Sequence, residues 1–419
     1  MNISNNIFLL IFTIQFSWCQ KILIPMDLSQ KDHLKAYGIA FNVLTKNINV
    51  EWLLNYRGGS FMVDEYPFIP QECRIRGVSF ERVHEGDVLS IYGTIDQNNM
   101  EVILLEKAPK IAIYTPPNKQ PWDDAVTLAL TYAEVPYESL WDEEVFIGGL
   151  DNIDWLHLHH EDFTGQYGKF YRNYHRAPWY IQQNKQFKAL ASSLGFISVH
   201  EEKKAIVRTI KNYVGQGGFL FAMCSATDSY DIALAEEGLD GAHSVFDGTP
   251  ITPKIQQKLD YSKTFAFTDF SIITDPMIYE YSDIDYPPSN KPVTRGAEAD
   301  YFSLFEFSAK YDPVPTMLTQ NHVGVVKGFM GQTTGFLKDK IKKHIIIMGE
   351  DPASDQVKYL HGSFGKGAFA FLAGHDPEDY QHFVGDPPTD LSLHRNSPGY
   401  RLILNNILFP AAKKKERKT

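Results

Sequence analysis

The sequence lacks an excess of basic residues and, beyond its first nineteen positions, any long apolar run. Its 40 Lys and Arg residues are outnumbered by 51 Asp and Glu residues, which gives a formal net charge of -11. Because binding to phosphates requires clustered Lys and Arg, this balance argues against nucleic acid as a partner. The one basic cluster, Lys413–Lys418, lies in a short tail, residues 412–419, that we expect to be solvated. No internal segment is long or apolar enough to predict a transmembrane span.

The first nineteen residues have the composition of a secretory signal peptide. Residues 7–16 are mostly apolar, and Ser17 and Cys19 occupy the small-residue positions before a cleavage site at Gln20. Asparagines near the start stand where lysine or arginine is usual. A lipoprotein leader acylated at Cys19 is the alternative, although Trp18 is too large for the residue expected before it. We therefore expect a periplasmic or secreted protein.

Cysteine is scarce. Apart from Cys19, the chain contains only Cys73 and Cys224. In an oxidising compartment these two could form one disulfide, provided that their Cα atoms come within bonding range. That disulfide would consume the only thiol available as a nucleophile. A reactive Cys224 and a disulfide-bonded Cys224 are therefore competing hypotheses.

The sequence does contain a regular alternation of strand-like and helix-like segments, with 43% hydrophobic and 13% aromatic residues. This pattern is typical of a well-packed α/β protein. We predict a mainly parallel sheet sandwiched by helices, of the flavodoxin-like type, over residues 108–411, with an insertion at about 238–343. Residues 20–107 are expected to add an N-terminal β-α-β region with parallel pairing. The expected strands are residues 21–25, 50–56, 102–105, 110–114, 137–140, 154–159, 219–223 and 344–348, with a hairpin at 357–373, and the expected helices are residues 32–46, 123–133, 201–214, 230–236 and 400–409.

Three polar segments follow predicted strands: His157–Asp162, Cys224–Asp228 and Gly374–Glu378. In open α/β sheets ligands bind beyond the carboxyl ends of the strands, so we expect these segments to converge on one cleft. The turn at Cys224 is also expected to direct the amides of a following helix at a ligand. The candidate catalytic residues are Cys224, Asp228, His375 and Glu378, and the candidate substrate-binding residues are His157, His159, His160, Glu161, Asp162, Thr227 and Asp376.

Two motifs stand in a definite order along the chain. The first is Gly217-Gly218, an apolar strand and Ala226–Ser229, and the second is Gly365-Lys366-Gly367, a strand and Gly374–Glu378, followed by Leu404–Leu408. In this order they resemble the ThuA-like (trehalose-utilisation) family, a branch of the class I glutamine amidotransferase-like superfamily. The resemblance covers residues 108–411, and residues 20–107 lie outside it. The whole chain also resembles an exported family of Bacteroidota that is often labelled asparagine synthetase B.

The amidotransferase branch implies that Cys224 is a nucleophile activated by His375, with Glu378 orienting the imidazole. A thiolate beside an imidazole at a helix N-terminus would have a depressed pKa. However, Asp376 interrupts the family's H-P-E spacing, and a small buried cysteine filling a tight turn is the alternative. Asparagine synthesis would need a catalytic cysteine at the N-terminus, whereas position 2 is Asn2. It would also need an ATP-binding loop, and the glycines of that loop are missing here.

A metal site is a further hypothesis. Imidazoles at His159, His160 and His375 are ligands suited to zinc. On a strand, His157 and His159 would share one face, and His160 would point elsewhere. Alternatively, no cofactor is required, and the histidines bind the hydroxyl groups of a sugar.

These observations lead us to expect an exported ThuA-like hydrolase that acts on a carbohydrate-related or amide small molecule. His375 would be its general base or metal ligand, oriented by Asp228 or Glu378, and an amide of the Cys224 turn would bind an oxyanion. The alternative is a non-catalytic binding or scaffold protein of the cell envelope. Glutamine-dependent asparagine synthesis is the third and least supported interpretation.

Overall fold

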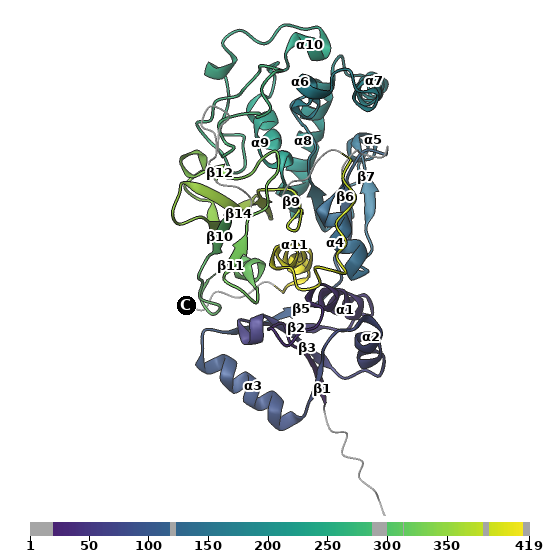
Figure 1. Ribbon diagram of the computed structural model, residues 1–419, viewed down its shortest axis with the longest axis vertical. Coiled ribbons are helices and arrows are strands. Elements are labelled where there is room, and N and C mark those ends of the chain that lie inside the picture. Colours follow the sequence, from purple (N-terminus) through teal and green to yellow (C-terminus); the bar gives the residue numbers. More distant parts are fainter. Residues whose placement is uncertain (1–19, 118–122, 287–299, 313, 380–384, 414–419) are drawn as a thin grey trace, which may run out of the picture.

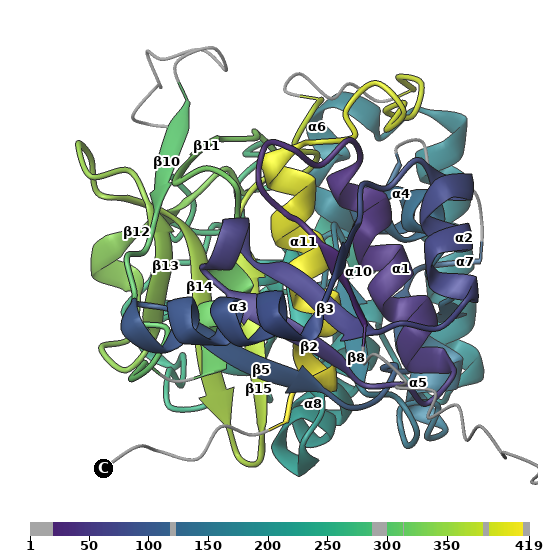
Figure 2. The same cartoon turned by 90° about the horizontal axis from the view of Figure 1, so that it is seen from below.

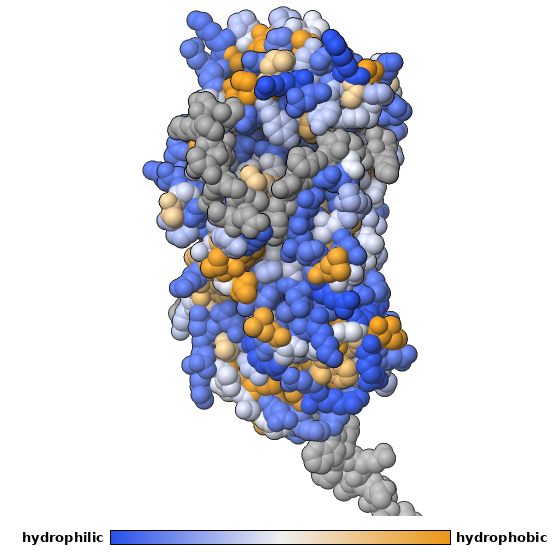
Figure 3. Space-filling view, viewed as in Figure 1, coloured by the Kyte–Doolittle hydropathy of each residue, from blue (hydrophilic) through white to orange (hydrophobic). Residues whose placement is uncertain are grey.

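The computed structural model describes residues 20–117, 123–286, 300–312, 314–379 and 385–413. The expected signal peptide, residues 1–19, lies outside the described residues, as does most of the basic tail. In Figure 1 the N-terminal residues form the lower part of the molecule, and a larger sheet with its helices forms the upper part. The face shown in Figure 3 is mainly hydrophilic, in keeping with the charged composition.

The N-terminal part is a five-stranded sheet with the order β4-β1-β3-β2-β5, in which every pairing is antiparallel. Helix α3 contributes to the hydrophobic cluster on one face, and α1 and α2 contribute to the cluster on the other. The elements are β1 (Lys21–Ile24), α1 (His33–Thr45), β2 (Val50–Leu54), β3 (Ser60–Asp64), α2 (Phe68–Arg76), β4 (Glu81–Val83), α3 (Glu85–Gln97) and β5 (Glu101–Leu105).

The predicted β-α-β unit with parallel pairing is therefore wrong. Strand β3 lies between β1 and β2 and pairs antiparallel with both. The cause is the reversal after β2, where Asn55, Arg57, Gly58 and Gly59 all have positive φ. Such left-handed residues turn the chain back within a few residues, so β3 pairs with β2 before any crossover can place another strand there.

The larger sheet is mixed and has the order β11-β10-β13-β14-β15-β9-β8-β6-β7, with β12 paired to β14. Five neighbouring strands, from β15 to β7, are parallel, and the other pairings are antiparallel. Its strands are β6 (Ile111–Tyr114), β7 (Glu138–Leu140), β8 (Trp155–Leu158), β9 (Phe219–Met223), β10 (Tyr301–Leu304), β11 (Val325–Lys327), β12 (Phe336–Leu337), β13 (Ile346–Glu350), β14 (Gln356–Phe364) and β15 (Gly367–Leu372).

The prediction of a mainly parallel, flavodoxin-like sandwich is thus also wrong. The parallel part is only one half of the sheet, because β14 and β15 form a tight hairpin whose turn contains Gly365 at a φ of 59°. A hairpin reverses the strand direction, whereas parallel pairing needs a long crossover. The region expected as an insertion, 238–343, contributes β10, β11 and β12 to the antiparallel half.

Helices cover both faces of the larger sheet. Alternate side chains of β9 enter different cores: Phe221 packs in the cluster that includes α1, α4 and α11, and Leu220 packs in the cluster that includes α8 and α9. Burial on both faces explains why the strand is apolar throughout. The helices are α4 (Ala125–Ala133), α5 (Asp142–Phe146), α6 (Tyr171–Tyr174), α7 (Pro178–Ser193), α8 (Val199–Gln216), α9 (Ser225–Ala235), α10 (Ser244–Asp247) and α11 (Pro398–Leu408).

The two sheets share one hydrophobic core. Helix α1 packs against α4 and α11, and Figures 1 and 2 show α11 between the N-terminal sheet and the larger one. The approach of α1 to α4 requires Gly38, because a Cβ there would lie 1.8 Å from the carbonyl oxygen of Ala133. Buried Arg401 of α11 donates to Met26 O at 2.8 Å and to Tyr37 Oη at 3.0 Å, both in the N-terminal part. Residues 20–107 are therefore an integral part of the folded chain.

Candidate functional site

The site lies at the carboxyl edge of the parallel strands β15, β9 and β8, which are neighbours in the sheet. His159 and His160 follow β8, Cys224 follows β9, and His375 follows β15. The ring centroids of His159 and His375 are 4.4 Å apart, and those of His160 and His375 are 5.7 Å apart. Because parallel strands end at the same edge, segments more than 200 residues apart in the sequence meet here, as the sequence pattern predicted.

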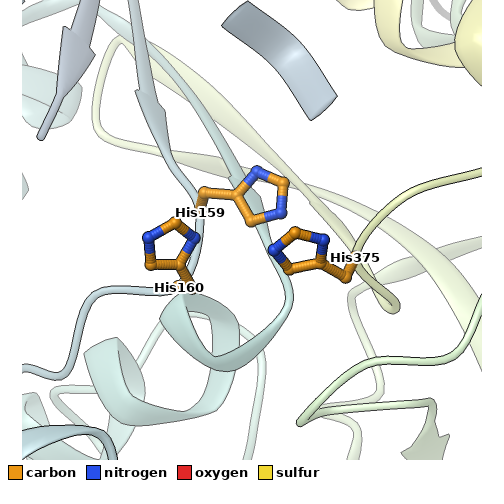
Figure 4. Close-up of side chains that lie close together, drawn as sticks. All are labelled: His159, His160 and His375. Carbon is orange, nitrogen blue, oxygen red and sulfur yellow. The ribbon is translucent and has the colours of Figure 1, made fainter. Parts of the chain in front are cut away.

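Three imidazoles form the centre of this site. His159, His160 and His375 each offer a ring nitrogen, and these nitrogens lie within 4.8 Å of one another. Figure 4 shows the three rings grouped around one space. The Nε2 atom of His159 is buried and has no hydrogen-bond partner among the described residues. A buried polar atom without a partner is costly, and three imidazoles are a ligand set that zinc uses in catalytic sites, where water takes the fourth position.

The expectation that His160 points away from the other histidines is wrong. Strand β8 ends at Leu158, so the alternation of side chains between the two faces of a strand no longer applies at His159 and His160. The chain turns after the strand, and the turn brings the ring of His160 to a centroid distance of 5.2 Å from that of His159. Both adjacent histidines can therefore serve one metal ion.

A carboxylate that the sequence analysis missed holds the first of these imidazoles. Asp124 Oδ1 lies 3.4 Å from His159 Nδ1, and Asp124 Oδ2 lies 3.5 Å from His157 Nε2. The carboxylate is itself fixed as the N-cap of α4, where it accepts hydrogen bonds from the amides of Val126 and Thr127. An aspartate directly before a predicted helix is a recognisable capping signal, but its proximity to a histidine 33 or 35 residues later is not readable from sequence.

The charges in this network influence one another. Burial disfavours ionisation of Asp124, but the neighbouring imidazoles of His159 and His157 outweigh it and hold the pKa of Asp124 well below its usual range. Burial likewise opposes protonation of His159, and Asp124 reverses this effect, so the pKa of His159 is raised. For His157 burial prevails and its pKa is lowered. With His157 Nδ1 placed 3.0 Å from the carbonyl oxygen of Phe221, a neutral His157 donates there and leaves Nε2 as an acceptor.

Two acidic residues complete this side of the site. Glu161 accepts a hydrogen bond at 2.8 Å from the backbone amide of His159, and burial raises the pKa of its carboxyl to about 7. Asp162 accepts from the amides of Thr164 and Gly168 and therefore organises the loop that follows β8. Both carboxylates are therefore held by backbone amides just beyond the end of β8.

Cys224 occupies a sharp turn between β9 and α9, with φ at 50° and ψ at -140°. The predicted strand, turn and helix are confirmed, although α9 begins at Ser225 and not at Tyr230. Only 2% of the Cys224 surface is exposed, and a Cβ added at Gly331 would lie 3.2 Å from its Sγ, so that backbone covers the thiol. Burial raises the pKa of Cys224 to about 11, despite hydrogen bonds from the amides of Thr333, Gln332 and Ser225. The expected depressed pKa is therefore wrong.

The burial of Cys224 and its free thiol bear on both hypotheses for this residue, the reactive nucleophile and the disulfide. Cys73 and Cys224 are free, so the disulfide alternative is wrong. The turn amides are also engaged: the amide of Ala226 donates to the carbonyl oxygen of His159 at 3.0 Å, and that of Thr227 donates to Cys224 O at 3.2 Å. The hydroxyl of Thr227 donates to the same carbonyl. This arrangement connects β8 to α9 and does not leave those two amides available for an oxyanion.

The other candidate residues have structural partners. Asp228 is buried, accepts from the hydroxyl of Thr333 at 3.0 Å, and has a pKa raised to about 7 by burial. Asp376 accepts from the hydroxyls of Thr389 and Tyr400, each at 2.8 Å, and so holds the loop that carries His375. The Glu378 carboxylate lies 3.1 Å from His394 Nδ1.

We predict that Cys224 resists alkylation in the folded protein. A thiol with a pKa near 11 is almost wholly protonated at pH 7.5, and its burial blocks access. Mass spectrometry after iodoacetamide treatment should therefore show unmodified Cys224 in the native state and full modification in urea. Rapid native-state labelling would mean that the turn opens and that the thiol is a candidate nucleophile again.

Comparisons with known proteins leave the function open. No family model and no curated protein matches the chain. A solved cytoplasmic protein from Salmonella typhimurium is 11% identical, with 73% of this chain and 100% of that chain covered and a TM-score of 0.35. A β-galactosidase from Bacillus circulans sp. alkalophilus is 9% identical, with 70% of this chain and only 32% of the enzyme covered and a TM-score of 0.28. Similarities this weak carry no argument about activity.

The described residues also include no helix that is long and apolar enough to span a membrane.

Proposed function

We propose that this protein is an exported, zinc-dependent hydrolase of small molecules, with the metal held by His159, His160 and His375. The observation that carries the proposal is that His159, a member of the three-histidine group, has a buried Nε2 atom with no hydrogen-bond partner among the described residues. Zinc would give that atom a partner and would supply a Lewis acid that activates water for attack on an electrophilic carbon. Export is proposed from the leader sequence alone.

The residues around the three histidines fit such a centre. Metal-bound imidazoles usually direct their second nitrogen to a carboxylate or carbonyl group, which fixes the orientation and tautomer of the ring. Asp124 is placed to do this for His159 Nδ1. His157, held by the carbonyl of Phe221, packs beside the same carboxylate. Glu161 is next in sequence to His160 and is fixed by the His159 amide. In the proposed reaction its carboxylate would receive a proton from the attacking water and return it to the leaving group.

The thiol mechanism of the amidotransferase branch has less support. Cys224 is buried with a raised pKa, and Glu378 lies against His394. The resemblance to the ThuA-like family rests on the sequence motifs and stays a prediction. A second three-residue group, His200, Asp240 and Asp247, is a poorer metal site. There the ammonium of Lys204 lies 3.4 Å from His200 Nδ1, and its charge would repel a cation.

Metal analysis with an activity screen tests this proposal. The purified protein should contain about one zinc per chain, and chelation should abolish hydrolysis of amide or glycoside substrates, with recovery after zinc is restored. Stoichiometric zinc without any metal-dependent turnover would instead favour the non-catalytic binding protein. Absence of zinc binding by the folded protein would contradict the proposed centre itself.

A further inference from the structure

A small cavity adjoins the three-histidine site. Its lining includes His160, which belongs to the histidine group, and the neighbouring Glu161. The cavity volume, measured as the space that the centre of a water molecule could occupy, is about 40 Å³. Because one water needs about 10–15 Å³ of such space, the cavity holds roughly three groups of that size. A sugar ring is much larger, whereas a chain of two or three carbon atoms fits.

The walls of the cavity are mainly apolar. The apolar lining includes three aromatic rings, those of Trp141, Phe170 and Phe187, and the aliphatic side chain of Val199. A sugar would bring several hydroxyl groups that each require a hydrogen-bond partner, and mainly apolar walls would leave most of them unpaired. The composition of the walls therefore favours a short aliphatic group, in agreement with the volume.

Apart from Glu161, to which the proposed reaction gives the proton transfer, the charged side chains that line the cavity are those of Asp162 and Lys203, and both are engaged by the protein. The Lys203 ammonium lies 2.5 Å from Asp142 Oδ2, donates to Tyr114 Oη at 2.9 Å and sits 4.0 Å from the centre of a Trp141 ring. Asp162 accepts backbone amides. The Lys203 charge is thus balanced within the protein, and we expect the cavity to select its occupant by size and apolarity, not by charge.

From this geometry we infer that the substrate is an N-acyl amide with a short acyl chain, of the acetyl or propionyl class, whose alkyl group enters this cavity. The inference rests on the proposed function, because the carbonyl carbon would then lie next to His160 at the metal site. Water attacks that carbon and transfers a proton to Glu161, the C–N bond breaks, and the departing nitrogen takes the proton. The products are a short carboxylic acid and a free amine, so all atoms balance without a further reactant. This reaction class removes acyl caps from amines, including amino sugars.

A chain-length series tests the inference. The zinc-loaded protein is assayed with 4-nitroanilides carrying acetyl, propionyl, butyryl and hexanoyl groups, and with 4-nitrophenyl glycosides for comparison. We expect kcat/KM to be highest for acetyl or propionyl and to fall by about tenfold or more at hexanoyl. Phe187→Ala enlarges the cavity and should shift the optimum toward longer chains. Phe196→Ala is the matched control, because this partly buried ring packs against Phe146 and does not line the cavity.

Four outcomes would contradict the inference. Rates that do not depend on chain length, or cleavage of glycosides with the acyl amides left intact, would overturn the substrate class and leave a zinc hydrolase in place. An acetyl preference that Phe187→Ala leaves unchanged, while the variant stays folded, would overturn the assignment of the cavity. If the zinc-loaded protein hydrolyses neither amides nor glycosides, the proposed function itself fails together with this inference.

Discussion

Replacing His159 with Ala is expected to remove zinc binding and hydrolysis together. His159 belongs to the three-histidine group, its Nδ1 lies against Asp124, and its Nε2 is buried without a hydrogen-bond partner among the described residues. Its loss leaves two imidazoles, which is one fewer than catalytic zinc sites use. Zinc affinity measured by competition with a chromogenic chelator should fall beyond the range of the assay, and turnover should fall with it.

A graded series makes this prediction sharper. Asp124→Asn keeps the size of the side chain but removes the charge that orients the His159 ring, and should weaken zinc affinity by about 10–100-fold. Cobalt substitution adds a spectroscopic readout, because a displaced imidazole changes the visible absorption of bound cobalt, whereas a general loss of stability does not. His175→Ala is the control, since this exposed residue lies at the end of α6, outside the three-histidine group. Unchanged zinc affinity in His159→Ala would refute the site.

The second large effect concerns stability. Arg401→Leu should destabilise the whole chain by about 3–6 kcal/mol. The guanidinium group is fully buried and donates to Met26 O, Tyr37 Oη and, through Nη2, Gly58 O. Leucine would remove the Arg401 donor from three acceptors, at about 1–3 kcal/mol for each buried group. The upper end of the sum is reduced by local relaxation and because Met26 O also lies 3.1 Å from His33 Nε2.

Urea unfolding, followed by circular dichroism and by tryptophan fluorescence, measures this effect. Because the two sheets share one core through α1 and α11, both signals should shift together in the variant. Arg395→Leu is the matched control, since Arg395 is exposed and its side chain donates to the nearby carbonyl oxygen of Ser392. A variant in which only the N-terminal part melts, with the rest unchanged, would contradict the shared core. A loss below 1 kcal/mol would contradict the energetic role of Arg401.

Arg401 is also connected to the site through its neighbour in α11. Tyr400 donates to Asp376, whose other oxygen accepts the amide of Glu378, and His375 directly precedes Asp376. The N-terminal residues, α11 and the His375 loop therefore form one contiguous set of contacts. We expect substitutions at Arg401 to perturb the site as well as the stability.

Local patterns in the sequence predicted the elements of the site well. The apolar runs of β8 and β9 end where polar residues begin, and the turn after β9 was predicted at Cys224. Such boundaries are local, because they depend on which residues tolerate burial on both faces of a sheet. The pairing of strands was predicted less well. The insertion of β3 between β1 and β2 depends on backbone angles at Asn55 and Arg57, two residue types that do not require a left-handed conformation.

The positions where the strands end, and the polar residues that stand at the edge of the sheet, follow from local hydrophobicity and spacing. The contacts that those residues make there depend on how distant parts of the chain pack together. That packing placed Asp124 against His159, turned His160 toward His375, and enclosed Cys224 so that burial keeps its thiol protonated. Each of these outcomes depends on contacts between distant segments and on the exclusion of water. The neighbours of a residue in the sequence specify neither the contacts nor the exclusion of water.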